Sequence, residues 1–157
     1  RYGNINTSII GDADAPRVRL PGTGGANDII SLCNETFVLT THEPRRFVER
    51  VDFVTSPGYL GGGRAREAAG LVHGGPSRVI TDLAVMDFEP RSRRMRVRAL
   101  QPGVELDDVR DATGFELLAD DELARLPAPE PEELAMLRRL NGEATTPPRT
   151  ESLAAGV

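Results

Sequence analysis

The sequence has 157 residues, 39% of them apolar and 27% charged, which is an ordinary balance for a single soluble globular domain. The net charge of −5 argues against wholesale attraction to nucleic acid, and no apolar run approaches the roughly 18–20 residues that a membrane helix needs. The single cysteine excludes an internal disulfide and fits a cytoplasmic location, and the His and Cys positions predict no metal site. No lysine is present, which excludes a lysine nucleophile within these residues.

The first third of the chain predicts short strands joined by turns. Residues 5–10 are β-branched and apolar, as in a strand, and residues 12–16 combine Asp, Ala and Pro, as in a turn. Residues 17–20 alternate polar and apolar side chains, which indicates a half-buried strand. The glycines of residues 21–25 follow, and a short helix over residues 27–33 comes next.

The middle of the chain predicts two strands and a long loop. Residues 37–41 and 51–55 have the composition of strands, with a charged turn at 43–46 between them. Four glycines within residues 56–63 leave little room for a regular element, so this segment should be a loop.

The following part predicts a β-hairpin. Residues 79–88 and 95–100 are two β-rich runs around a loop at 89–93. Arginines alternate with apolar residues in the second run, so one face of that strand should be wet, that is, exposed to solvent. A short helix over 106–112 and a short strand over 115–118 are predicted after it.

The C-terminal part predicts one helix and a tail. Residues 132–140 have acids near their start and arginines near their end, an order that suits the helix dipole. We expect residues 1–140 to form the domain and residues 141–157 to be a disordered tail. Together the elements predict an α/β fold with a mixed sheet, in which a strand–glycine loop–helix unit precedes an antiparallel hairpin.

The segment 20–28 is the one most suited to chemistry. A strand that ends at glycines and turns into a helix directs several backbone N–H groups at one point, where a phosphate or a developing oxyanion could bind. No Lys-Ser/Thr pair follows the glycines, which excludes a P-loop, and Asn27 replaces the third glycine of a dinucleotide-binding motif. On spacing alone, a structural tight turn is an equal alternative.

The order and spacing of several segments resemble the β subunit of family I CoA-transferases, particularly the glutaconate type, from about residue 1 to 140. The matching segments are residues 3–6, 9–12, 18–28, 47–59, 79–86, 102–104 and 109–115. The resemblance implies a NagB/RpiA/CoA-transferase-like open mixed sheet flanked by helices. It also implies an α-subunit partner in a hetero-oligomer.

The resemblance further implies an activity. CoA would move between an acyl-CoA and a carboxylic acid through a glutamyl-CoA thioester, with coenzyme A as substrate and no permanently bound cofactor. Gly22, Gly24 and Gly25 would supply backbone donors to the oxyanion of each intermediate. The family's nucleophilic glutamate lies upstream of the glycine motif, and no Glu precedes Gly22 here. We therefore expect the N-terminal part to be missing and this chain alone to be inactive.

Several residues have both a functional and a structural interpretation. Ala26, Asn27 and Asp28 are candidates for contact with CoA, but a helix cap formed by Asn27 or Asp28 is favoured. His42 could touch the acyl group, but a surface histidine is favoured. Cys33 is expected to be a small core residue.

Two longer segments are also open to two interpretations. Residues 56–63 are the second candidate segment, because a glycine-rich loop after a strand can line a site. They could equally be slack, that is, a loose connection between two halves of the domain. The arginines of residues 91–98 are interpreted as the wet face of the hairpin, with contact to the α subunit or to CoA phosphates as the alternative.

Three functions are therefore considered: a CoA-transferase β subunit, an acyl-CoA hydrolase of the same fold, and a non-catalytic assembly subunit. The intact sequence of residues 22–25 favours transfer, because the resemblance implies that the ring-opening hydrolase branch of the superfamily is altered at this loop.

Overall fold

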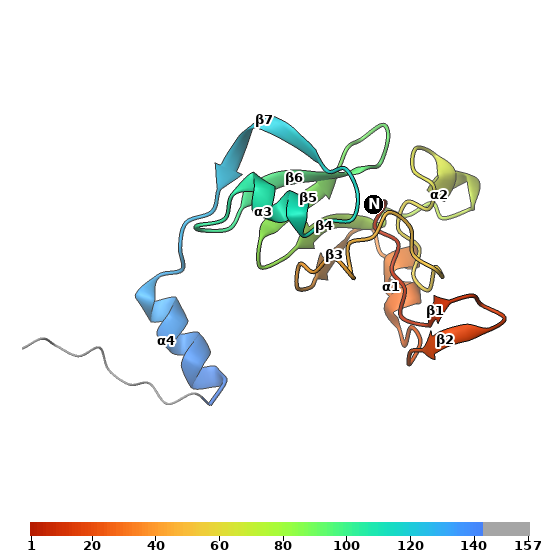
Figure 1. Ribbon diagram of the computed structural model, residues 1–157, viewed down its shortest axis with the longest axis horizontal. Helices are drawn as coiled ribbons and strands as arrows, with labels where there is room; N and C mark the ends of the chain where they lie inside the picture. The colour runs from red at the N-terminus through yellow and green to blue at the C-terminus, as the bar shows by residue number, and fades with distance from the viewer. Residues whose placement is uncertain (143–157) are drawn as a thin grey trace, which may run out of the picture. The chain divides into compact units, whose positions relative to one another are not determined.

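The computed structural model describes residues 1–142, which belong to two compact units that divide between Leu126 and Pro127. The first unit contains a five-stranded sheet with the strand order β3-β4-β5-β6-β7 (Figure 1). Its strands are β3 (Thr36–Leu39), β4 (Pro76–Ile80), β5 (Ala84–Phe88), β6 (Met95–Leu100) and β7 (Leu118–Arg125). β3 and β4 are parallel, β4, β5 and β6 form an antiparallel meander, and β7 returns parallel to β6. The predicted α/β fold with a mixed sheet is confirmed.

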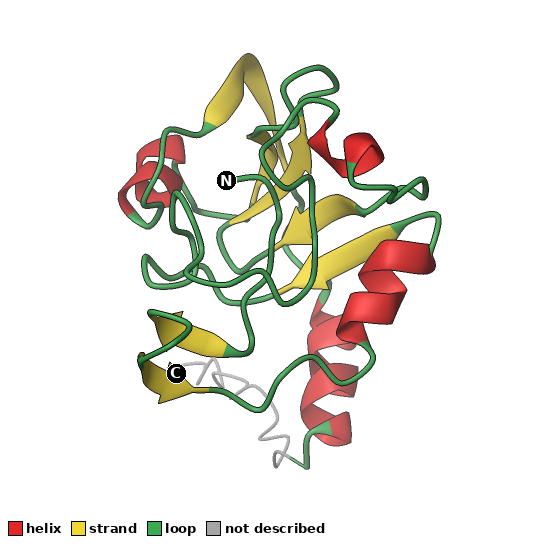
Figure 2. Cartoon of the chain, turned by 90° about the vertical axis from the view of Figure 1, so that its right-hand side faces the viewer, coloured by secondary structure: helices red, strands yellow, loops and turns green. Residues whose placement is uncertain are grey.

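The remaining elements of the first unit are short. A separate antiparallel pair consists of β1 (Ile9–Gly11) and β2 (Pro16–Arg19), and it leads into the helix α1 (Ala26–Leu32). The helices α2 (Ala65–Ala68) and α3 (Leu106–Asp111) follow β3 and β6. Long loops connect these elements, as Figure 2 shows in green.

The core lies along the central strands of the sheet. Ala84 and Met86 of β5, Val97 of β6 and Val109 of α3 are all completely buried. Burial of a side chain such as Val or Met stabilises the fold by roughly 1.5–3 kcal/mol. The residues between them in β5 and β6 are more exposed, so burial alternates along the strands as predicted.

The predicted wet face of the hairpin is confirmed, and its arginines have partners within the chain. Arg96 donates two hydrogen bonds of 2.9 Å to the carboxylate of Asp87. Arg98 forms an ion pair with Asp120 of β7 and lies 3.6 Å from Asp87. These pairs link β5, β6 and β7 on the face opposite the core.

Two predicted strands in the middle of the chain differ from the observed elements. Residues 51–55 contain no strand, because their main chain bends and only Ser56 forms a bridge, to Ile5. The run 79–88 is two strands rather than one, since the hydroxyl of Thr81 accepts hydrogen bonds from the amides of Leu83 and Ala84 and closes a turn.

The last strand and the first one are also displaced from their predicted positions. β7 occupies Leu118–Arg125 rather than residues 115–118, because pairing with β6 extends it through a polar sequence. The first strand is confined to Ile9–Gly11, since the side chain of Asn6 accepts hydrogen bonds from the amides of Ser8 and Ile9 and turns the preceding main chain.

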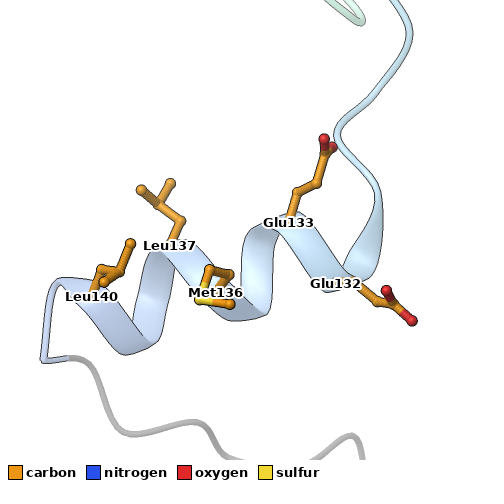
Figure 3. Close-up of a pocket in the computed structure, with 5 residues that line it drawn as sticks. All are labelled: Glu132, Glu133, Met136, Leu137 and Leu140. Atoms are coloured by element: carbon orange, nitrogen blue, oxygen red, sulfur yellow. The ribbon is translucent and has the colours of Figure 1, made fainter.

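The described part of the second unit contains the helix α4 (Pro131–Leu140), close to the predicted range. Glu130 and Glu133 form a capping box at its start. Met136, Leu137 and Leu140 line a shallow groove on this helix, with Glu132 and Glu133 at the groove's N-terminal end (Figure 3). Most of the expected tail, from residue 143 on, lies outside the described residues. Within residues 1–142 no helix has the length and apolarity required to cross a membrane.

Candidate functional site

The glycine loop connects β2 to α1 and is held to the segment before β1. The amide of Leu20 donates to Ser8 O and the amide of Gly22 to Thr7 O, each at 2.8 Å. Gly22 and Gly24 have φ angles of +96° and +53°, which side chains with a Cβ rarely adopt. The glycines therefore allow the chain to turn away from β2 and enter the helix within a few residues.

Gly25 stands at the N-cap of the helix that follows, and Thr23, rather than Asn27 or Asp28, supplies a side-chain acceptor to its first turn. Its hydroxyl oxygen accepts a 2.7 Å hydrogen bond from the amide of Asn27, and its carbonyl accepts one of 3.0 Å from Ala26. α1 begins at Ala26, so Asn27 and Asp28 already lie inside it. The side chain of Asn27 instead accepts a hydrogen bond from Ser31 Oγ at 3.0 Å. The predicted cap is therefore wrong, because Gly25 occupies the N-cap position and the hydroxyl of Thr23, earlier in the loop, accepts the first-turn hydrogen bond.

Two adjacent amides of the loop donate to no acceptor among the described residues, and the space beside their residues is open. Within the described residues, the N–H groups of Gly24 and Gly25 donate to no main-chain carbonyl. No atom of residues 1–142 lies within 4 Å of the position that a Cβ would take on Gly22, Gly24 or Gly25. The loop can therefore offer two neighbouring N–H donors to an anionic oxygen and leaves room for the molecule that carries it.

A group of hydroxyl side chains lies beneath this loop. Ser56 is 1% exposed, and its Oγ lies 3.5 Å from Thr23 Oγ1. Thr55 donates to Ser8 Oγ at 2.9 Å and accepts a hydrogen bond of the same length from the amide of Thr7. Sequence reasoning named Ser56 only as part of the candidate segment 56–63 and missed Thr55 and Ser8; the only signal was two adjacent hydroxyl residues before a glycine-rich stretch.

The second candidate loop, residues 56–63, is packed against the start of the chain. The amide of Gly58 donates to Asn4 Oδ1 at 3.0 Å, and the hydroxyl of Tyr59 donates to Pro76 O at 2.8 Å. A Cβ added to Gly58 would lie 2.3 Å from the carbonyl of Gly3. This segment is therefore not slack between two halves of the domain.

His42 is buried, so the prediction of a surface histidine is wrong. Its Nδ1 lies 3.1 Å from Thr81 Oγ1 and its Nε2 lies 2.9 Å from Thr113 Oγ1, while its ring stacks on Phe47. Burial lowers the pKa of His42, and the charge of Asp82 partly opposes that shift. These contacts make the histidine a bridge between the ends of β3, β4 and α3.

Cys33 is exposed, so the prediction of a core residue is also wrong. It stands at the C-cap of α1 with an extended main chain, beyond the last helical turn. Ile30 is the residue of α1 that is buried.

Comparison with known proteins identifies the family. Residues 1–112 match the family model described as Coenzyme A transferase. The chain belongs to the coenzyme A transferase family. The family resemblance predicted from the sequence is therefore confirmed, and this match includes the glycine loop.

Individual relatives agree with this assignment. The β subunit of 3-oxoadipate CoA-transferase from Pseudomonas knackmussii is 40% identical over 140 residues, which cover 89% of this chain and 54% of that protein. The crystal structure of glutaconate coenzyme A-transferase from Acidaminococcus fermentans matches with a TM-score of 0.80 and 38% identity, covering 87% of this chain and 52% of that chain. Within the CoA-transferases the chain thus corresponds to the β subunit, and its mixed sheet has the fold of that family.

A third relative is named for a different activity. The cholesterol ring-cleaving hydrolase IpdB subunit of Mycobacterium tuberculosis is 34% identical over 138 residues, which cover 88% of this chain and 54% of that protein. The chain spans about half the length of the curated relatives that it matches.

Proposed function

We propose that this chain supplies the oxyanion-binding loop of a CoA-transferase that moves CoA between an acyl-CoA and a carboxylic acid. The observation that carries the proposal is the pair of amides at Gly24 and Gly25, which donate to no carbonyl of residues 1–142 and belong to glycines with open space beside them, inside the segment that matches the family. Gly22 contributes a left-handed main-chain conformation that turns the loop. It does not contribute a donor, because its own N–H already donates to Thr7 O.

The reaction proceeds by nucleophilic catalysis. A glutamate carboxylate attacks the thioester carbonyl, and the tetrahedral intermediate expels CoA as a thiolate and leaves an acyl-glutamyl anhydride. The thiolate then attacks the glutamyl carbonyl, which releases the first acid and forms the glutamyl-CoA thioester. A second carboxylate repeats the two steps in reverse and leaves as the new acyl-CoA. No residue of this chain is assigned as the glutamate.

The role of the loop is to stabilise the negative oxygen of each tetrahedral intermediate. Donors that are already oriented by the fold need no reorganisation when this charge develops. Removal of one such donor costs on the order of 10²–10³ in rate. Thr23 supports the geometry, because its hydroxyl and carbonyl fix the amides of Asn27 and Ala26.

Contact with CoA after the glycines would involve side chains rather than the first helical amides. The N–H groups of Ala26 and Asn27 already donate to Thr23. Asp28 follows them in the first turn and is exposed. CoA is a substrate in this proposal, and an α subunit in a cytoplasmic hetero-oligomer would complete the enzyme.

Hydrolysis of a CoA thioester is the second candidate, and the 34% identity to a subunit named as a ring-cleaving hydrolase shows that hydrolytic chemistry occurs among the relatives of this chain. In that case water would replace the acceptor acid, and free CoA would be released. The same two amides would stabilise the oxyanion in either reaction.

The test uses the full chain together with any polypeptide that copurifies with it. An acyl-CoA is supplied with and without a panel of carboxylic acids, and both free CoA and new acyl-CoA are measured. Transfer predicts that a new acyl-CoA forms only with an acceptor acid and that a glutamyl-CoA adduct is detected by mass spectrometry in a complete complex. Acceptor-independent release of CoA would support the hydrolase, and absence of both reactions in a complete complex would leave an assembly role.

A further inference from the structure

Arg66 of α2 is a buried arginine that the reaction does not use. The residue is only 4% exposed to solvent. The Nε atom donates to His73 O at 2.8 Å, and Nη1 donates to Pro57 O at 2.7 Å and to Gly58 O at 3.0 Å. Nη2 donates to Ile30 O at 2.7 Å and to Ser31 O at 3.4 Å.

Every one of these acceptors is a main-chain carbonyl. No carboxylate of residues 1–142 forms an ion pair with Arg66. Ile30 and Ser31 lie in the last turn of α1, where carbonyls lack partners within the helix and carry partial negative charge. Arg66 therefore closes the C-terminal end of α1 with a charged group, and burial lowers its pKa.

The guanidinium holds both segments that support the glycine loop. α1 starts at Ala26, directly after the loop, and is about 10 Å long at 1.5 Å per residue. Pro57 and Gly58 follow Ser56, whose hydroxyl lies 3.5 Å from that of Thr23. One planar side chain thus fixes α1 and the segment beside Thr23 relative to each other.

We propose that Arg66 is a positioning residue that fixes the orientation of the glycine loop through α1 and through the segment 56–58. The proposal rests on the proposed function for its catalytic consequence, since it assumes that the amides of Gly24 and Gly25 bind the reacting oxygen. A lysine cannot replace it, because an ammonium group is a point charge that cannot reach three separate segments in fixed directions.

Gly75 provides an independent way to disturb the same contact. A Cβ on Gly75 would lie 3.1 Å from Arg66 Cζ and Nε and 3.2 Å from Nη1. Gly75→Ala therefore keeps the arginine but pushes against its guanidinium, and because it also strains a main chain with a φ of +79°, it is compared with Gly70→Ala, where φ is +80° and the Cβ would meet no described atom within 4 Å. Gly75→Ala should affect the glycine loop in the same direction as Arg66→Lys.

The test compares Arg66→Ala and Arg66→Lys with Val109→Ala, a cavity variant in the completely buried core position on α3. Hydrogen exchange is followed at the amides of Gly22 and Asn27, which donate to Thr7 O and Thr23 Oγ1. Both Arg66 variants should speed exchange at these two amides roughly tenfold or more through local opening. Val109→Ala should lower global stability and leave these two amides close to wild type.

A rescue experiment separates positioning from general loss of structure. Guanidinium chloride at a concentration far below denaturation should slow exchange at Gly22 and Asn27 in Arg66→Ala, while sodium chloride at equal ionic strength should not. In an active complex, Arg66→Ala should lower kcat with little change in KM for the acyl-CoA. If Arg66→Ala does not fold, Arg66→Lys and Gly75→Ala decide the question by exchange alone.

The proposal is overturned if the two loop amides exchange at wild-type rates in the Arg66 variants, or if Val109→Ala accelerates them equally. The proposed function can fail separately. If the wild-type complex neither transfers nor hydrolyses, the exchange comparison still decides whether Arg66 positions the loop.

Discussion

The chain contains two glycine-rich loops, residues 21–25 and residues 56–63, whose surroundings differ. A methyl group added at Gly24 or Gly25 would meet no described atom within 4 Å. A methyl group added at Gly58 would lie 2.3 Å from Gly3 O, and one at Gly62 would lie 2.6 Å from Ser92 O. Glycine therefore serves two purposes in one chain: it leaves space for a ligand in the first loop and allows close packing of the main chain in the second.

The comparison shows why glycine content alone does not identify a site. The first loop follows the strand β2 and the second follows a bend, and both contain several glycines. Only the first combines open space with two amides that donate to no carbonyl among residues 1–142. Substitution by alanine distinguishes the two purposes, because the same methyl group should affect stability in one loop and activity in the other.

The largest effect on stability is expected from Gly58→Ala. The added methyl would overlap the main chain of Gly3, which is fixed by neighbouring hydrogen bonds and cannot move freely. We expect a loss of about 3 kcal/mol in the free energy of unfolding, measured by urea denaturation. Gly61→Ala is the matched control from the same loop, since its methyl would only reach Ala65 Cβ at 4.0 Å. Equal stability of the two variants would refute the packing role of Gly58.

We expect the free energy of unfolding to depend on pH through His42. This residue is buried between Thr81 and Thr113. Because burial lowers the pKa of His42 below its ordinary 6.5, the unfolded chain binds a proton at a higher pH than the folded chain. The neutral, buried side chain of His42 therefore contributes to stability. This contribution is complete above pH 6.5 and is lost as the pH falls from there through the folded-state pKa. Its slope is at most about 1.4 kcal/mol per pH unit.

The measurement is the free energy of unfolding between about pH 5 and pH 8 for the wild type and His42→Gln. The difference between the two should grow smaller as the pH falls below 6.5. His73→Gln is the control, because that histidine is exposed. An identical slope in the wild type and in His42→Gln would show that the burial of His42 does not shift its titration.

A smaller effect is expected from Thr23→Val in the open loop. The substitution removes the oxygen that accepts the Asn27 amide at 2.7 Å and preserves the shape of the side chain. We expect a loss of about 1 kcal/mol in the free energy of unfolding, the usual net contribution of one hydrogen bond. Thr23→Ser keeps the oxygen and should stay near wild type. If both variants lose the same stability, the methyl contact rather than the hydrogen bond matters.

The parts of the fold that follow local patterns could be predicted from the sequence. The alternation of arginines with Met95 and Val97 places those two side chains in the core, because burial along a strand has a period of two. The glycine segment could also be predicted, since a strand, glycines and a helix occur in that order. The length of β7 could not, because pairing with β6 decides it rather than its own polar sequence.

The contacts that position the site depend on distant residues, and local patterns do not reveal them. His42 is buried by Thr81 and Thr113, which lie 39 and 71 residues further along the chain. Arg66 binds only main-chain carbonyls, and such acceptors leave no mark in a sequence of side chains. Local preference favours Asn27 or Asp28 as the cap of α1 because both residue types are common caps, whereas the structure has Gly25 at the N-cap and uses the hydroxyl of Thr23 as the acceptor.

The central claim is that the open space beside Gly24 and Gly25 receives the reacting carbonyl, and Gly25→Ala tests it most directly. Gly25 has a φ of −84°, so alanine fits its main chain without strain. In the complete complex, the free energy of unfolding should change by less than about 0.5 kcal/mol. The kcat for CoA transfer should fall about 100-fold, because the methyl group would displace the reacting oxygen from its donors. A Gly25→Ala complex that transfers CoA at the wild-type rate, like the Gly61→Ala control, would contradict the account.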